Sequence, residues 1–148
     1  MSFRFTSLLA LSALLVSACQ STPSAPCADT QAIVESVAKM HPEIARLTVH
    51  TTPAGGSGPI AVASTMAEKL GKPSDPEDLK AMAKNLTVTM EEVGSYDVTV
   101  PICMKNGKAT AAVGVTFNTD KGTDKAQLTE LANAVAKVVE DRMAGMKK

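Results

Sequence analysis

Residues 96–118 read YDVTVPICMKNGKATAAVGVTFN and predict the long β-hairpin around which the fold is organised. Asn106-Gly107 separates two runs of strand-forming residues, and both residues accept the positive φ that a two-residue hairpin turn requires. The turn sets the register, and side chains alternate between the two faces of a strand. The cross-strand pairs expected on one face are Ile102 with Ala111, Val100 with Val113, Val98 with Val115, and Tyr96 with Phe117.

The opposite face of this hairpin is small and polar. It is expected to carry Asp97, Thr99, Cys103, Thr110, Ala112, Gly114 and Thr116. Such a face suits a close-packed helix or a small ligand. Pro101 interrupts the pattern because proline has no N–H, so either one ladder hydrogen bond is lost or a bulge forms there.

The composition excludes some classes of protein. The chain has 148 residues, 45% of them hydrophobic, which fits one domain with a core of its own. The formal net charge is zero and aromatic residues make up 3%, so neither a basic surface nor a stacking platform for bases is present. We therefore expect no nucleic-acid partner.

The first residues have the pattern of an export signal. Arg4 precedes an apolar run, Leu8 to Val16, that is too short to span a bilayer. The run ends in LVSAC at Cys19, which resembles the lipobox of bacterial lipoproteins. The resemblance implies a signal peptide over residues 1–18, cleavage before Cys19 and acylation of that cysteine with palmitate-like chains. The alternative is an ordinary secretory signal followed by a chance cysteine.

The lipobox resemblance also implies a location. Gln20, rather than Asp, follows the cysteine, which implies anchoring in the outer membrane facing the periplasm. Residues 19–28 are then a polar, Pro- and Ser-rich tether, and residues 29–148 form a single domain. An oxidising location permits a disulfide between Cys27 and Cys103; the alternative, a buried Cys103 and a free Cys27, stays open.

The remaining pattern predicts an α+β domain. A helix is expected from Asp29 or Thr30 to about His41, short helices over residues 65–70 and after Ser74 or Asp75, and a last helix capped by Asp124 with Gln127. Strands are expected over residues 47–52, 60–64 and 86–90 besides the hairpin, with a turn over residues 43–46; an alternative end for the strand that starts at Leu86 is Val93. The Gly-rich loop 53–59 precedes a strand and is interpreted as a connection rather than a phosphate site. These elements make a five-stranded antiparallel sheet with N- and C-terminal helices and short helices between strands two and three.

Three stretches carry a family resemblance: Ala63-Ser64-Thr65, residues 69–79 (KLGKPSDPEDL), and residues 97–102 (DVTVPI) with the hairpin turn. They resemble bacterial extracytoplasmic PAS-like sensor domains of the Cache type. The resemblance implies that organic acids or amino acids bind between the sheet and the helices after strand two. Cache domains normally sit between two membrane helices and drive an output module, whereas here a lipid anchor is expected instead.

Motifs for catalysis or metal binding are absent from the sequence. It has no nucleophile elbow, His-Glu-x-x-His or Cys-x-x-Cys motif, and His50 with Cys103 lacks a local signature of a nucleophile and its base. Asp75, Glu77 and Asp78 suit the start of a helix, and the methionines are spread as core filling would spread them. We expect no enzyme, metal or cofactor.

The expected ligand site consists of Ser64, Thr65, Tyr96 and Asp97, with Lys69 or Arg46 able to meet a carboxylate. Alternatively, Ser64 and Thr65 cap the short helix and Tyr96 belongs to the core. The sequence thus predicts a lipid-anchored cell-envelope protein that binds or senses a small organic molecule. The second hypothesis is a ligand-free interaction module that docks on another envelope protein, such as a receptor or signalling partner.

Overall fold

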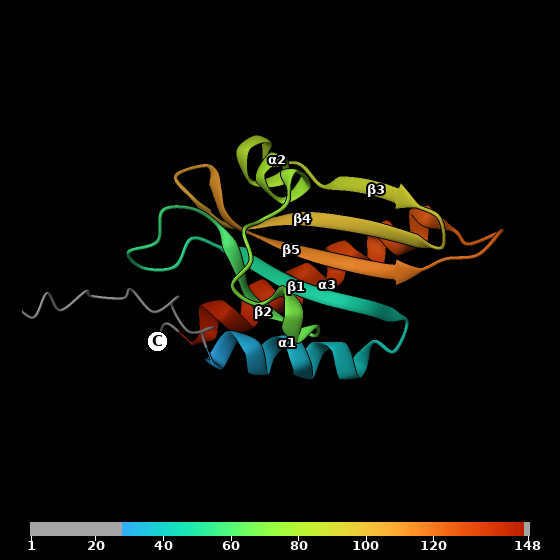
Figure 1. The fold of residues 1–148 in the computed structure, drawn as a ribbon, viewed down its shortest axis with the longest axis horizontal. Coiled ribbons are helices and arrows are strands. Elements are labelled where there is room, and N and C mark those ends of the chain that lie inside the picture. Colours follow the sequence, from blue (N-terminus) through green and yellow to red (C-terminus); the bar gives the residue numbers. More distant parts are fainter. Residues whose placement is uncertain (1–27, 147–148) are drawn as a thin grey trace, which may run out of the picture.

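The computed structural model describes residues 28–146. Its elements follow the chain as α1 (Ala28–Met40), β1 (Ile44–Thr51), β2 (Ile60–Ser64), the short 3-10 helix η1 (Ala67–Lys69), α2 (Pro76–Lys84), β3 (Val88–Glu92), β4 (Ser95–Lys105), β5 (Lys108–Asn118) and α3 (Lys125–Gly145). The five strands form one antiparallel sheet in the order β2-β1-β5-β4-β3. The predicted α+β class and PAS-like sheet are therefore confirmed (Figure 1).

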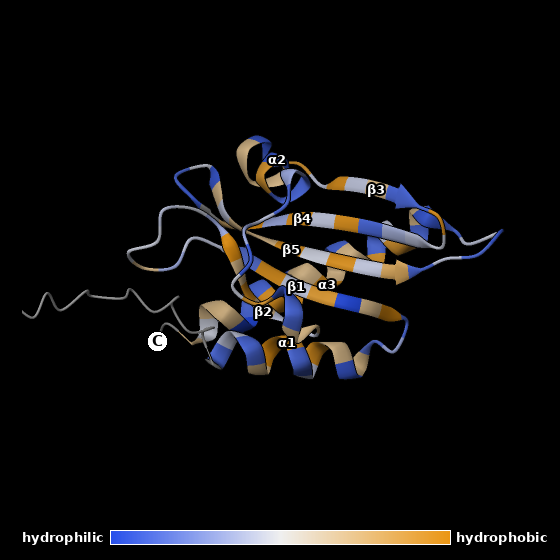
Figure 2. Ribbon diagram, in the orientation of Figure 1, coloured by the Kyte–Doolittle hydropathy of each residue, from blue (hydrophilic) through white to orange (hydrophobic). Residues whose placement is uncertain are grey.

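The β4–β5 hairpin has the predicted register. All four expected pairs form, from Ile102 opposite Ala111 to Tyr96 opposite Phe117. Hydrophobic and polar residues alternate along both strands (Figure 2), so one face of the sheet is apolar. With side chains of β1 and the helices it forms the core, whose largest fully buried members are Phe117, Leu47, Val34, Val37, Val49, Val98, Val113, Val115, Val135 and Val139.

Helices α1 and α3 cover this apolar face, and α3 runs behind the strands in Figure 1. Helix α3 begins at its N-cap Asp124, whose carboxylate accepts hydrogen bonds from the N–H groups of Ala126 and Gln127. Its apolar stripe buries Ala132, Val135 and Val139 against the sheet. The two terminal helices thus cover the apolar face over β2, β1, β5 and β4.

Helix α2 packs on the opposite face, against β3, β4 and β5. Asp75 is its N-cap and Pro76 its first residue, as one of the two predicted starts required. Asp78, in the first turn, accepts a hydrogen bond from the N–H of Asp75 (3.0 Å). A second bond joins Thr99 Oγ1 of β4 to Asp78 Oδ1 (3.4 Å), so the start of α2 is fixed to the sheet by polar contacts.

Two predicted boundaries are wrong. β1 begins at Ile44 rather than at Leu47, so the turn predicted over residues 43–46 is strand. The strand starts earlier because β5 is long enough for Phe117 to pair with Ile44. β3 lies at Val88–Glu92, so it begins two residues after the predicted Leu86 and runs past Met90, as the alternative extension allowed, because it pairs with Ser95–Thr99 of β4 across a tight turn.

Cys103 does not lie on the polar face as predicted. Its φ is +57°, and its side chain packs against the apolar core while its N–H donates to Glu140 Oε1 of α3 (2.6 Å). This left-handed residue turns the strand locally and ends the simple alternation. Pro101, by contrast, stays in register opposite Ala112, so no bulge forms at the proline.

The predictions for the N-terminal segment concern residues that the structure does not describe. The signal peptide, the acylated Cys19, most of the tether and Cys27 lie outside the described residues, so the cleavage, the lipid and the disulfide to Cys103 stay predictions. Between residues 28 and 146, no helix combines the length and the hydropathy needed to cross a membrane.

Candidate functional site

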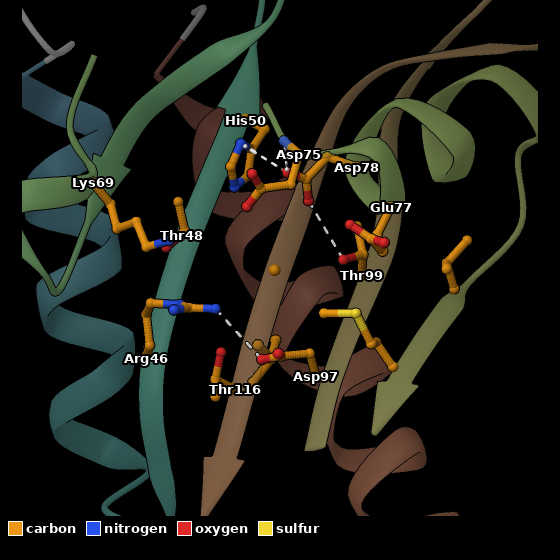
Figure 3. A pocket seen from close by; sticks show the side chains of 14 residues that line it. Arg46, Thr48, His50, Lys69, Asp75, Glu77, Asp78, Asp97, Thr99 and Thr116 are labelled. Carbon is orange, nitrogen blue, oxygen red and sulfur yellow. Dashed lines mark hydrogen bonds and ion pairs between the residues drawn. The ribbon is translucent and has the colours of Figure 1, made fainter. Parts of the chain in front are cut away.

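A small cavity opens on the polar face of the sheet, between the strands and the start of α2. The space open to the centre of a water-sized sphere is about 50 Å³. Side chains from β1, β3, β4, β5, η1 and the start of α2 surround it (Figure 3). The lining residues are Arg46, Thr48, His50, Lys69, Asp75, Glu77, Asp78, Val88, Met90, Asp97, Thr99, Gly114, Val115 and Thr116.

Strand alternation assembles most of this lining. Arg46, Thr48 and His50 are every second residue of β1, so they share one face. The neighbouring strand places Gly114 opposite Thr48, and a Cβ added at Gly114 would lie 3.9 Å from His50 Nε2. The missing side chain therefore leaves room at the floor of the cavity.

His50 and Asp78 form a buried polar pair at one end of the cavity. His50 is 8% exposed and Asp78 is 5% exposed, and Nδ1 of the imidazole lies 3.3 Å from Oδ2 of the carboxylate. The same Nδ1 lies 3.0 Å from Ser74 Oγ. The register between β1 and β2 shifts between Val49 and His50, a local irregularity beside the imidazole.

The second ring nitrogen of His50 is open to the cavity. Every side-chain nitrogen or oxygen of the described residues that is fully enclosed has a hydrogen-bond partner. His50 Nε2 makes no hydrogen bond within residues 28–146, so this nitrogen is not fully enclosed. An ionised carboxylate can only accept, so contact with Asp78 favours the proton on Nδ1. Nε2 then presents its lone pair to the cavity.

Burial shifts the pKa of both members of the pair toward the neutral form. It lowers the pKa of the His50 imidazole to about 4, an effect that nearby Asp75 opposes and that Arg46 and Lys69 reinforce. It raises the pKa of the Asp78 carboxyl to about 6, against the hydrogen bonds from Asp75 N–H and Thr99. At neutral pH the imidazole is therefore uncharged and the carboxylate is mostly ionised.

Two basic side chains occupy the other side of the cavity. Arg46 Nη2 lies 3.5 Å from Asp97 Oδ1 in a partly buried ion pair. Lys69, which comes from η1, is also partly buried, and its side chain makes no hydrogen bond or ion pair with any described residue. In Figure 3 both lie on the β1 side, facing the acidic groups at the start of α2.

The structure brings together three of the six predicted ligand-binding residues. Arg46, Lys69 and Asp97 line the cavity. Tyr96 is on the opposite face, where its hydroxyl bonds Thr129 Oγ1 of α3 (3.0 Å), as the alternative interpretation required. Tyr96 and Asp97 are consecutive residues of β4, and consecutive side chains of a strand point to opposite faces of the sheet.

Ser64 and Thr65 also lie outside the lining of the cavity. Ser64 Oγ contacts Thr48 Oγ1 (2.9 Å) and accepts from Met66 N–H (3.1 Å), while its backbone pairs with the side-chain amide of Gln31 on α1. Thr65 Oγ1 accepts a hydrogen bond from Leu47 N–H (3.1 Å). Both side chains therefore fix the end of β2 to its neighbours.

The sequence interpretation missed the role of His50, Asp75, Glu77 and Asp78. As a site residue, His50 was considered only as a base for Cys103, and the acidic residues were placed only at a helix start. The alternation of polar residues along β1 placed His50 on the correct face, but only tertiary packing sets α2 above it.

Two further observations limit the chemistry of the site. Among the described residues, no group of three or more His, Cys, Asp or Glu side chains is arranged to hold a metal ion. A larger hollow, of about 830 Å³, lies between α2 and the ends of β1 and β5, lined by Thr51, Thr52, Pro59, Leu79, Met82, Ala83, Lys105, Lys108, Ala109 and Thr110. It is a more open surface depression without a buried pair of ionisable side chains like His50 and Asp78, so we assign the site to the smaller cavity.

Several solved structures resemble this chain. The GAF-B domain of DevS from Mycobacterium smegmatis has a TM-score of 0.50 and 13% sequence identity, over 82% of this chain and 98% of that domain. The GAF domain of an Acinetobacter phosphoenolpyruvate-protein phosphotransferase has a TM-score of 0.49 and 15% identity, over 76% and 80% of the two chains. A type II free methionine-R-sulfoxide reductase from Thermoplasma acidophilum gives the same score and identity, over 76% and 89%. No family model matches the chain, and no curated protein is significantly similar to it.

These findings correct the family resemblance. The expectation of a Cache-type domain is wrong, because the match with a TM-score of 0.50 is a GAF domain, and GAF domains share the PAS-like fold. The expected lipid anchor lies outside the described residues. The stretches behind that expectation contain turns and caps, such as Gly71, Asn106-Gly107 and the Asp75 cap, which different α+β domains share. At 13% identity the likeness to the DevS domain shows the fold alone.

Proposed function

We propose that this protein is a binding domain for a small organic molecule with an acidic group, held in the cavity by Arg46 and Lys69. The observation that carries the proposal is the placement of both basic side chains, partly buried, on one side of a cavity whose far end is the buried His50–Asp78 pair. A sheet face that served stability alone could have been filled with apolar side chains. Buried ionisable groups cost stability, and they gather where a ligand has to be recognised.

The size of the cavity limits the ligand. One water needs at least about 10–15 Å³ of such space, so 50 Å³ encloses roughly three to five non-hydrogen atoms. Sites that enclose drug-sized molecules are several times larger. The ligand is therefore small, or only its charged end is enclosed.

The proposal concerns binding rather than catalysis. The one pairing of nucleophile and base considered from the sequence, Cys103 with His50, is separated by the sheet: His50 contacts Asp78 beneath α2, while Cys103 packs against the core beneath α3. The open cavity favours a ligand over the second hypothesis, a ligand-free interaction module. The lipid-anchored, cell-envelope location is an inference from the sequence on which the proposal does not depend.

Isothermal titration of the full chain with small carboxylates and amino acids tests this proposal. A ligand should raise the melting temperature as well, because it stabilises the folded state that binds it. Lys69→Gln should weaken binding at least tenfold. Lys72→Gln is the matched control, since Lys72 is an exposed lysine of the same segment that does not line the cavity. Equal loss in both variants, or no binding by any probe, would refute the proposal.

A further inference from the structure

The charges around the cavity are divided between its two sides. Arg46 and Lys69 lie on the side of β1 and η1, and Asp75, Glu77 and Asp78 lie at the start of α2 (Figure 3). Asp97 is already paired with Arg46. Acidic groups therefore outnumber basic ones in the lining.

Two of these charges lack a protein partner within the described part of the chain. Neither the ammonium group of Lys69 nor the carboxylate of Glu77 makes a hydrogen bond or ion pair with residues 28–146, although both side chains are partly buried and line the same cavity. They do not pair with each other, because the cavity lies between the two sides. A partly buried charge gains from an opposite charge supplied by a ligand.

A ligand with only one charge suits this lining poorly. A lone carboxylate beside Lys69 would be repelled by the acidic groups at the start of α2. A lone amine beside Glu77 would be repelled by Lys69 and Arg46. A molecule that carries both charges pairs with both sides and leaves the net charge of the cavity unchanged.

We propose that the ligand is a small bipolar molecule, whose carboxylate meets Lys69 and Arg46 and whose ammonium group meets Glu77 and Asp75. The inference rests on the proposed function, because it specifies the ligand of the same cavity. His50 Nε2, open to the cavity, is an acceptor that the ammonium group can also use. The enclosed space fits a molecule of only a few non-hydrogen atoms, counting those of its two charged groups.

Matched probes test the inference by isothermal titration of the full chain. Glycine, β-alanine and 4-aminobutyrate carry both charges at increasing separation. Acetate, propionate and butyrate keep only the carboxylate, and methylamine, ethylamine and propylamine keep only the amine. We expect at least one bipolar probe to bind ten or more times more tightly than its carboxylate-only and amine-only partners.

A variant pair separates the two proposals. Glu77→Gln should weaken the bipolar probe at least tenfold and leave the weak binding of its carboxylate-only partner unchanged or stronger, while Glu68→Gln, an exposed change on η1 that does not line the cavity, should alter neither. If a carboxylate binds as tightly as its bipolar partner, the inference is wrong and the proposed function stands. If an amine alone binds as tightly, or no probe binds, the inference and the proposed function both fail.

Discussion

The imidazole of His50 and the carboxylate of Asp78 lie 3.3 Å apart, Nδ1 to Oδ2, and join the middle of the sheet to the first turn of α2. Both groups are buried, and burial favours the neutral form of each. The pair therefore links the folding of this face to pH. It also fixes which nitrogen of the imidazole faces the cavity.

Replacing Asp78 by Asn should stabilise the protein increasingly as the pH rises. The pKa of Asp78 is raised from 3.8 to about 6 on folding, so the folded state is favoured by a bound proton below this range and loses that advantage as the pH rises through it. Asn carries no charge to bury. Asp78→Asn should therefore gain roughly 2–3 kcal/mol relative to wild type between pH 4 and pH 7.

Urea unfolding of both proteins across this pH range measures the difference. Asp29→Asn, the same change at an exposed position in the first turn of α1, serves as the control. A difference between Asp78→Asn and wild type that does not vary with pH would show that Asp78 titrates alike in the folded and unfolded chains.

His50→Gln should have the opposite dependence. The pKa of His50 is lowered from 6.5 to about 4 on folding, so the unfolded chain binds a proton that the folded protein does not. Wild type therefore loses stability as the pH falls from about 6.5 to 4, by roughly 2–3 kcal/mol, and Gln, which does not titrate, avoids this loss. The same unfolding series tests it, and a parallel decline of both proteins over that range would contradict the assignment.

Gly114 offers a way to fill the cavity without disturbing the fold. A Cβ there would lie 3.9 Å from His50 Nε2 and 4.0 Å from Asp78 Oδ1, both ordinary contact distances. Gly114→Ala should change the free energy of unfolding by no more than about 1 kcal/mol. It should nevertheless weaken ligand binding several-fold, and Gly114→Val should weaken it further. Unchanged affinity in both variants, measured by titration calorimetry, would place the ligand elsewhere.

The central hairpin shows how much of the fold the sequence predicts. The Asn106-Gly107 turn is local, and the period of two then determines which residues face the core, so the four cross-strand pairs were predicted correctly. Cys103 was placed on the wrong face because its φ of +57° depends on contacts with α3, including the bond to Glu140. Local patterns cannot show such tertiary contacts.

The candidate site was predicted only in part for the same reason. Arg46 and Lys69 were chosen by charge and Asp97 as a polar residue of the hairpin, and all three line one cavity. The acidic residues of α2 belong to the site because α2 folds back over the sheet, a placement that no spacing in the sequence specifies. Ser64 and Tyr96 were polar residues near the right strands, but their hydroxyls hold β2 and α3 in place.

Tyr96→Phe tests this separation between the two faces. The substitution removes the hydroxyl that bonds Thr129 and keeps the buried ring. It should lower the free energy of unfolding by about 0.5–1.5 kcal/mol and leave ligand affinity unchanged. Chemical unfolding and calorimetry on the same preparation measure both quantities. A loss of ligand affinity without a loss of stability would show that Tyr96 belongs to the ligand site after all.

The most direct test of the central claim is the nuclear magnetic resonance spectrum of the histidine side chains, with ¹⁵N in the ring. His50 lines the cavity, whereas His41 lies after α1 and bonds Glu43, so it is an internal control; the His50→Gln variant assigns the signals. Each small carboxylate and bipolar probe is added in turn to the full chain. We predict a saturable shift of the His50 ring nitrogens, with those of His41 unchanged. Unmoved His50 signals with every probe, or equal shifts of both histidines, would contradict binding in this cavity.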